Sequence, residues 1–170
     1  MSPSPSPGHR LRPATDADLD IVLSLNESEV VNLAPMDQAR FFELRGLADR
    51  FDVIEVDGRF GGFVVTFAPG TRYDSENYRW FEAHLEDGFY YLDRVVLARS
   101  VRRRGVGGWV YDVLEPVAAT YGRMALEVNL VPENAPSLAF HQARGYVEVG
   151  RRGDEAHLVS LLTKDLTSAR

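Results

Sequence analysis

Cysteine is absent from this chain of 170 residues. A disulfide framework, a thiolate zinc site and a cysteine nucleophile are therefore excluded. A chain without cysteine is compatible with a reducing compartment, and on this weak ground we predict a cytoplasmic protein.

Long apolar runs and an excess of basic residues are also absent. No apolar run approaches the roughly 20 residues that a transmembrane helix needs, so we expect no membrane partner. The 19 Lys and Arg residues are outnumbered by 25 Asp and Glu residues, which gives a formal net charge of −6. Domains that bind nucleic acid usually carry a basic face, so we expect no nucleic-acid partner.

The composition that remains is that of a globular domain. Hydrophobic residues make up 45% of the chain and charged residues 26%, and the length is that of one ordinary domain. Residues 1–8, MSPSPSPG, alternate Ser and Pro and contain no apolar stretch. We predict that they form a disordered tail and that residues 9–170 fold as a single domain.

The spacing of apolar residues predicts alternating strands and helices. A first helix is expected to start at Thr15 or Asp16, and a second helix after Pro35. Two β-prone runs flank Asp57-Gly58, which predicts a hairpin. An initial strand is expected near residue 9, before the two helices. The elements predicted after these helices are a hairpin over 51–70, a helical piece within 75–85 and a central strand over 88–97. They are followed by a helix over 106–121, a strand over 123–130, a helix over 134–144, and strands over 146–152 and 156–166. This order predicts an α/β or α+β fold with a mixed sheet.

Residues 102–108, RRRGVGG, lie between a predicted strand and a predicted helix. A helix N-terminus presents unpaired N–H groups and the positive end of the helix dipole, which favours a phosphate or pyrophosphate. Glycine lets such a group approach the backbone, and arginine adds charge-assisted hydrogen bonds. The alternative is an ordinary helix start with solvated arginines. Two nucleotide motifs fail here, because GxGxxG would need a glycine at Val110 and a P-loop would need Gly-Lys-Ser/Thr.

The motif Arg102-x-x-Gly105-x-Gly107 resembles the acetyl-CoA signature Q/R-x-x-G-x-G/A of the GNAT family of acyl-CoA-dependent N-acetyltransferases. Downstream, NAPSLAFHQARGY at residues 134–146 resembles the family pattern N-x-x-A-x-x-(F/L)-Y-x-x-x-G-(F/Y). Two motifs at this separation are far more specific than either alone. The resemblance implies a GNAT-like fold: a mixed, mostly antiparallel sheet of about seven strands with a splayed central parallel pair, flanked by four or more helices.

The resemblance also implies acetyl-CoA as a co-substrate, with no metal. The pantetheine arm is expected in a wedge between residues 92–97 and 125–129, bonded to the main chain of the first strand and to Asn134. The pyrophosphate is expected at the backbone N–H groups of the glycine-rich loop. The cofactor-binding residues predicted in this way are Val95, Val96, Leu97, Arg102, Arg103, Arg104, Gly105, Val106, Gly107, Gly108, Asn134, Ser137 and His141.

Acetylation of an amine requires a base, because an ammonium with a lysine-like pKa of about 10.4 is almost wholly protonated at pH 7. Strand alternation places Glu127 and Asn129 on one face of a core strand, where burying them without a role would be costly. Glu127 is the first candidate for the general base, a role that a glutamate in this strand serves in some relatives. Its alternative is an ion pair with Arg94 or Arg144.

Two further residues are candidates for proton transfer. Asp93 in the neighbouring strand is the second candidate base, and its alternative is a structural ion pair that orients the basic loop. His141 stands where most relatives carry a tyrosine that protonates the leaving thiolate, and a histidine with a pKa of about 6.5 is a competent acid near neutrality. Its alternative is a helix-surface or CoA-contacting histidine, in which case Tyr90, Tyr91 or water would donate.

The acceptor is the least determined part of the prediction. Residues 71–87 precede the cofactor strand, where relatives often place an acceptor-binding loop, and we predict Tyr78 and Trp80 in this stretch as acceptor-binding residues. Asn129, on the strand of Glu127, is the third predicted acceptor-binding residue, and its alternative role is to fix the end of that strand. The alternative is a solvated loop with its aromatic residues in the core. Amino acids, polyamines, aminoglycoside-like amines and peptide N-termini all remain open.

We therefore predict an N-acetyltransferase that moves an acetyl group from acetyl-CoA to a primary amine by direct attack in a ternary complex. The alternatives are a non-catalytic CoA-binding sensor or interaction module on the same fold, and a general nucleotide-binding domain. Exposed final strands also make a homodimer a possible assembly.

Overall fold

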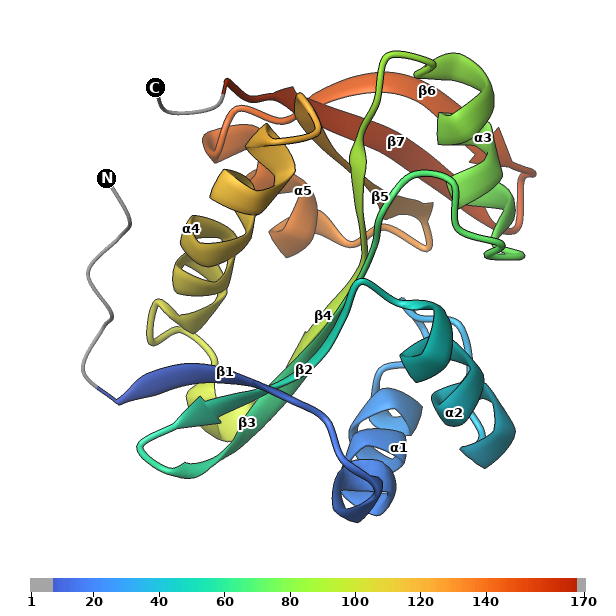
Figure 1. Ribbon diagram of the computed structural model, residues 1–170. Coiled ribbons are helices and arrows are strands. Elements are labelled where there is room, and N and C mark those ends of the chain that lie inside the picture. Colours follow the sequence, from blue (N-terminus) through green and yellow to red (C-terminus); the bar gives the residue numbers. More distant parts are fainter. Residues whose placement is uncertain (1–7, 168–170) are drawn as a thin grey trace.

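A seven-stranded sheet crosses the molecule in the order β1-β2-β3-β4-β5-β7-β6 (Figure 1). The computed structural model describes residues 8–167, so the predicted tail falls almost wholly outside the described residues. The strands are β1 (His9–Pro13), β2 (Arg50–Val56), β3 (Arg59–Phe67), β4 (Tyr90–Leu97), β5 (Arg123–Val131), β6 (Val147–Gly153) and β7 (Leu158–Asp165). The helices are α1 (Leu19–Ser28), α2 (Gln38–Leu47), α3 (Glu76–His84), α4 (Val106–Ala119) and α5 (Ala135–Ala143).

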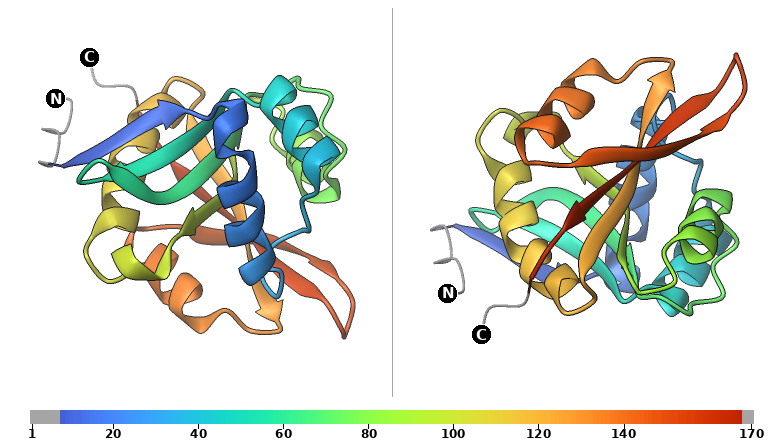
Figure 2. Two further views of the ribbon diagram at one scale, coloured as in Figure 1. Left: turned by 90° about the horizontal axis from the view of Figure 1, so that it is seen from below. Right: turned by 90° about the horizontal axis from the view of Figure 1, so that it is seen from above.

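The sheet is mixed, as predicted. Neighbouring strands run antiparallel except β4 and β5, which are parallel. The edge strands β1 and β6 lie on opposite sides of the molecule (Figure 2). The predicted order of strands and helices is confirmed, whereas pairing of the last strands between subunits stays a prediction.

Local sequence signals explain most element boundaries, and two helix boundaries differ from the predicted ones. The hairpin turn is confirmed at Asp57 and Gly58, whose φ angles of 53° and 76° are both positive, as a tight hairpin turn requires. The first α-helix begins later than predicted, at Leu19, because a short 3₁₀ turn (Asp16–Asp18) comes first. Helix α4 ends earlier, at Ala119, because its last turn tightens to i→i+3 hydrogen bonds such as that from Tyr121 N–H.

Helices cover both faces of the sheet and bury two separate hydrophobic clusters. One cluster packs α1, α2 and α3 against the sheet, and the other packs α4 and α5 against the opposite face. Strand β5 serves both clusters by alternation, with Ala125 in the first and Leu126 in the second. None of the helices between residues 8 and 167 is long and apolar enough to cross a membrane.

The parallel pair at the centre of the sheet separates soon after it forms. Only Tyr90 with Met124 and Tyr91 with Ala125 are paired in the described residues, although both strands continue well beyond. At the same point β4 contains a bulge, because Val65 pairs with Arg94 and Thr66 pairs with Leu92, which leaves Asp93 as the extra residue. A bulge bends its strand, so β4 turns away from β5 where the pairing ends. The predicted splayed pair is confirmed.

Arg94, next to the bulge, ties the α1–α2 connection to the sheet. Its side chain is only 3% exposed and pairs with Asp93 at 2.6 Å. The same guanidinium donates to the Asn26 side chain at 2.9 Å and to the Ala34 carbonyl at 3.1 Å. One buried cation therefore joins β4, α1 and the segment that follows α1.

Replacing Arg94 with Met should destabilise the protein by about 3–5 kcal/mol, because it leaves the carboxylate of Asp93 buried without its partner. Urea denaturation at pH 7 measures the change. The exposed Arg99, replaced in the same way, should change the free energy of unfolding by less than about 0.5 kcal/mol. Equal stability of the two variants would contradict this role for Arg94.

Candidate functional site

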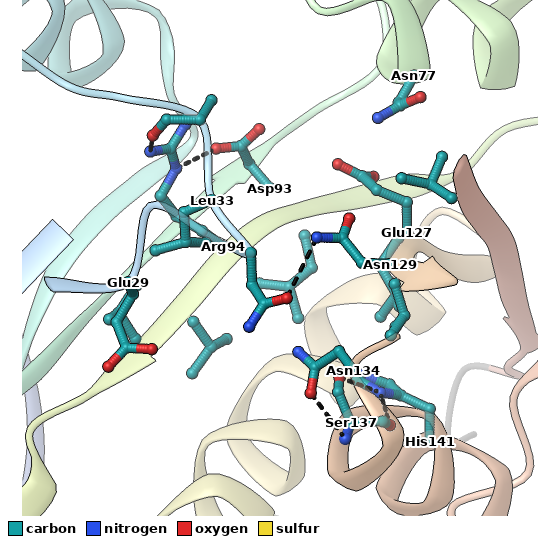
Figure 3. Close-up of a pocket in the computed structure, with 18 of the residues that line it drawn as sticks. Glu29, Leu33, Asn77, Asp93, Arg94, Glu127, Asn129, Asn134, Ser137 and His141 are labelled. Atoms are coloured by element: carbon teal, nitrogen blue, oxygen red, sulfur yellow. Dashed lines mark hydrogen bonds and ion pairs between the residues drawn. The ribbon is translucent and has the colours of Figure 1, made fainter. Parts of the chain in front are cut away.

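A cavity of about 1290 Å³ opens where β4 and β5 separate. Its walls come from both diverging strands, the α1–α2 connection, the starts of α3, α4 and α5, and the β6–β7 hairpin. Figure 3 shows Glu127 and Asn129 on one side of this space, with Asn134, Ser137 and His141 grouped on α5. Residues that lie far apart in the sequence thus meet at a single site.

The start of α4 forms one end of the cavity. Gly105 precedes the helix with a φ of 77°, and no side chain caps this helix. The N–H groups of the first turn have no intrahelical acceptor and add to the positive end of the helix dipole. Gly105, Val106, Gly107 and Gly108 all line the cavity, so this end presents N–H donors suited to an anion.

Packing within the protein does not explain why Gly107 and Gly108 are glycines. A methyl group at Gly107 would meet nothing closer than the Leu97 side chain at 3.7 Å, and one at Gly108 nothing closer than Arg144 at 3.8 Å. Glycine also costs helix stability relative to alanine. Glycine at these two positions therefore leaves empty space at the helix start and lowers helix stability. This is expected where a ligand approaches the backbone.

The three arginines of the loop have different surroundings. Arg102 lines the cavity, donates to the Leu97 carbonyl at 3.1 Å and pairs with Glu29 at 2.5 Å. Arg103 lines the cavity as well. Arg104 does not; it points to the β2–β3 turn and pairs with Asp57 at 3.5 Å. The predicted contact of Arg104 with the cofactor has no support in this geometry.

The edge of β4 that faces the gap forms a second wall. Val95, Val96 and Leu97 line the cavity, and their part of the strand has no pairing with β5 among the described residues. Peptide groups along this edge are available to bind an extended ligand as a neighbouring strand would. This is the place where the sequence resemblance puts the pantetheine arm.

Helix α5 contributes Asn134, Ser137 and His141, which all line the cavity. The Asn134 side chain caps the helix by accepting from the Ser137 N–H at 3.4 Å. The side-chain oxygen of Asn134 is therefore occupied by the helix cap, whereas its side-chain NH₂ group can donate to a ligand.

His141 is held at both ring nitrogens. Nδ1 lies 2.7 Å from the Ser137 carbonyl, which can only accept, so the ring proton of a neutral His141 sits on Nδ1. Nε2 lies 2.5 Å from the Tyr111 hydroxyl and, lacking a proton, accepts a hydrogen bond from it. Burial lowers the pKa of His141, which favours the neutral ring. Tyr111, on α4, also lines the cavity and was not anticipated from the sequence.

Glu127 lies at the cavity wall without an ion-pair partner among the described residues. The Tyr91 hydroxyl donates to its two carboxyl oxygens at 2.8 and 2.6 Å. Burial, reinforced by the charge of Asp93, raises the pKa of Glu127 to about 8, although hydrogen bonds from Tyr91 and Asn77 oppose the rise. The alternative ion pairs do not occur among the described residues, because Arg94 pairs with Asp93, and Arg144 pairs with Asp112 and Glu115.

Asp93 also lines the cavity but is fully engaged. Besides its pair with Arg94, it accepts from the Tyr73 hydroxyl at 2.6 Å. It contacts none of the loop arginines in the described residues, so the idea that it orients the basic loop is not supported. Its charge acts instead on Glu127, whose pKa it helps to raise.

The predicted acceptor-binding residues separate into two groups. Asn129 lines the cavity and donates to the Val31 carbonyl at 3.3 Å. Tyr78 and Trp80 do not line it: Tyr78 is fully buried in the first hydrophobic cluster, and Trp80 packs against Gly150 and His84. Their apolar rings are removed from water, which is the core interpretation that the sequence left open.

Several cavity residues were missed. Tyr73 and Asn77 lie within the stretch predicted to bind the acceptor but were not selected, and Arg152 projects from β6. No local pattern marks Arg152, because its position depends on pairing between strands at the far end of the chain. No cluster that could hold a metal ion occurs within residues 8–167.

Replacing Glu127 with Gln should make the stability of the protein less dependent on pH. The folded pKa of about 8 exceeds the ordinary value of 4.5, so the folded state keeps a proton that the unfolded chain releases. The stabilisation this gives is fully present below about pH 4.5 and is lost as pH rises to about 8.

The free energies of unfolding of the wild type and Glu127→Gln, compared by urea denaturation between pH 4.5 and 9, test this. The wild type should lose stability relative to the variant up to about pH 8, with no further change above. A difference that is constant across this range would show that Glu127 titrates normally.

Comparison with known proteins identifies a family that matches this chain. The sequence model of the acetyltransferase (GNAT) family matches residues 20–146. A search of curated proteins finds no match. Solved structures with a similar fold are numerous, and three of them illustrate the likeness.

Ard1 from Thermoplasma volcanium is 16% identical, with a TM-score of 0.72 over 95% of this chain and 99% of that chain. The ribosomal-protein-S18-alanine N-acetyltransferase of Escherichia coli is 14% identical, with a TM-score of 0.69 over 95% and 96%. Arabidopsis thaliana Naa50, in complex with the bisubstrate analogue CoA-Ac-MVNAL, is 12% identical, with a TM-score of 0.66 over 94% and 99%. Identities this low support the fold alone, but the family match spans most of the chain, and the protein belongs to the GNAT acetyltransferase family.

Proposed function

We propose that the protein transfers an acetyl group from acetyl-CoA to a primary amine by direct attack in a ternary complex, with Glu127 as the general base. One observation carries this proposal: a carboxyl group with a pKa of about 8 stands in the gap between two diverging strands, in the same cavity as a glycine-rich helix start. Acyl transfer to an amine needs a base of this kind near the thioester.

The residues present fit acetyl-CoA. The first turn of α4 offers N–H donors, and Gly107 and Gly108 leave room for a pyrophosphate at the backbone. The unpaired edge of β4 suits the amide groups of a pantetheine arm, and the Asn134 amide faces the same cavity. The complex of Arabidopsis thaliana Naa50 with a CoA-containing analogue agrees with this assignment.

Glu127 accepts the proton that the amine must lose. Acetyl-CoA supplies the thioester; the amine nitrogen bonds to its carbonyl carbon, and the carbon–sulfur bond breaks. The carboxylate of Glu127 takes the proton that converts the bound ammonium into the attacking amine, and the proton that the nitrogen loses on forming the amide passes to water. Tyr91 orients that carboxylate through its two hydrogen bonds. A carboxyl group with a pKa of about 8 is a stronger base than an ordinary glutamate, so it competes better for the proton of an ammonium.

Asp93 acts on Glu127 through its charge. Arg94 pairs with it at 2.6 Å, and the charge of Asp93 helps to raise the pKa of Glu127. In this scheme Asp93 is a positioning residue that tunes the base, and it does not take the proton itself.

His141 is assigned a positioning role in place of the predicted acid role. The proton of the neutral ring is held by the Ser137 carbonyl, and Nε2 accepts from Tyr111, so the ring has no proton free for a leaving thiolate. A dedicated acid is not required, because a thiol has an ordinary pKa of about 8.5 and leaves readily as a thiolate in mildly basic solution. Water in the cavity then supplies the proton.

Replacing Glu127 with Gln should lower kcat by about 100- to 10,000-fold without weakening CoA binding. The wild-type rate should rise with pH through about 8, and this step should be absent in the variant. Thiol release with a broad amine panel measures kcat, and thermal stabilisation by CoA measures binding. The exposed Glu133, which does not line the cavity, provides the control as Glu133→Gln.

The outcomes separate the alternatives. Stabilisation by CoA without thiol release from any amine would favour a CoA-binding sensor. Stabilisation by ATP or NAD but not by CoA or acetyl-CoA would favour a nucleotide-binding domain and would overturn the proposal.

Replacing Gly107 with Ala should raise the free energy of unfolding by about 0.5–1 kcal/mol and yet weaken CoA binding. The added methyl group improves helix stability but occupies space at the proposed pyrophosphate site. Gly46, in α2, is the matched control, because a methyl group there meets nothing within 4 Å and lies outside the cavity. Gly46→Ala should give the same stabilisation with unchanged affinity for CoA. Equal affinity in both variants would argue against the site at α4.

A further inference from the structure

Arg152 reaches from the edge strand β6 to the start of α3, and both residues it contacts line the cavity. One terminal nitrogen donates to the Asn77 side-chain oxygen at 2.9 Å, and the other donates to Glu76 at 2.9 Å. The Glu76 side chain is 78% exposed. Pairs with such an exposed partner contribute little to stability, so a carboxylate from a ligand can replace Glu76 at small cost.

Asn77 connects this guanidinium to the proposed base. Its oxygen accepts from Arg152, and Asn77 is one of the groups that lower the pKa of Glu127. Figure 3 shows Asn77 and Glu127 facing each other across the cavity. Asn77 thus contacts the cation and lies opposite the base.

Two other arginines of the cavity, Arg40 and Arg94, and the carboxylate of Asp154 also have partners within the protein. Arg40 holds Asp74 through two hydrogen bonds of 3.1 and 2.6 Å, and Arg94 is buried against Asp93. Asp154, on the β6–β7 hairpin, accepts from the N–H groups of the turn that it closes. Arg152 differs, because one of its partners is a neutral amide and the other is an exposed carboxylate.

We propose that the acceptor is an amino acid, an amine that carries a carboxylate close to its nitrogen. The amine lies at Glu127, and the carboxylate replaces Glu76 at Arg152. An arginine guanidinium matches a planar carboxylate with two parallel hydrogen bonds, which sets both the position and the orientation of the ligand. This inference rests on the proposed function and narrows it to one class of amine.

Matched substrates test the proposal. Thiol release from acetyl-CoA is measured at pH 8 with the twenty amino acids and with the corresponding amino acid amides, which keep the amine and lack the negative charge. The wild type should prefer at least one amino acid over its amide. Replacing Arg152 with Gln should lower kcat/KM for that amino acid by about 10- to 100-fold and change kcat/KM for the amide by less than about threefold.

Two further variants distinguish recognition from a structural role. Arg151 on the same strand is 58% exposed, pairs with Glu148 and does not line the cavity, so Arg151→Gln should leave the preference unchanged. Glu76→Gln removes the carboxylate that competes for Arg152, so it should lower KM for the amino acid. If Arg152 only linked β6 to α3, Arg152→Gln and Glu76→Gln would shift KM in the same direction.

Three results would overturn the proposal. Equal turnover of amino acids and their amides, or turnover of other amines alone, would reject the amino acid acceptor and leave the acetyltransferase proposal standing. Stabilisation by CoA without turnover of any amine would reject both.

Discussion

The whole site depends on the early separation of β4 and β5. Two parallel residue pairs hold these strands together, and the bulge at Asp93 then bends β4 away. A continuous ladder would have satisfied the peptide groups of both strands and filled the space between them with side chains. Separation leaves backbone donors and acceptors open to a ligand and gives the polar side chains of β5 a cavity to face.

Electrostatics within the cavity follow from how its charges are partnered. Arg94 lies against Asp93, and the charge of Asp93 is one reason why the pKa of Glu127 is raised. Glu127 has only hydrogen-bonding neighbours, the Tyr91 hydroxyl among them. Of these two carboxyl groups, Asp93 is held by an ion pair and Glu127 by hydrogen-bond donors without an ion pair in the described residues.

The sequence predicted those features that depend on local pattern. Alternation along β5 was sufficient to place Glu127 on a polar face, and the glycine spacing was sufficient to locate the helix start that lines the cavity. Features that depend on distant pairing were not predictable. Arg152 meets Asn77 across 75 residues of sequence, and only the register of β6 on β7 brings it there. The position of His141 was predicted, but the location of its proton depends on its two partners in the fold.

The gap between β4 and β5 passes through the sheet rather than resting on one side of it. Its lining includes residues from α4 and α5 on one face and from α3 and the α1–α2 connection on the other. The cavity therefore has walls on both faces of the sheet. The wall on the α4 side and the wall on the α3 side come from separate segments of the chain, so substitutions can reshape one of them while the other keeps its form.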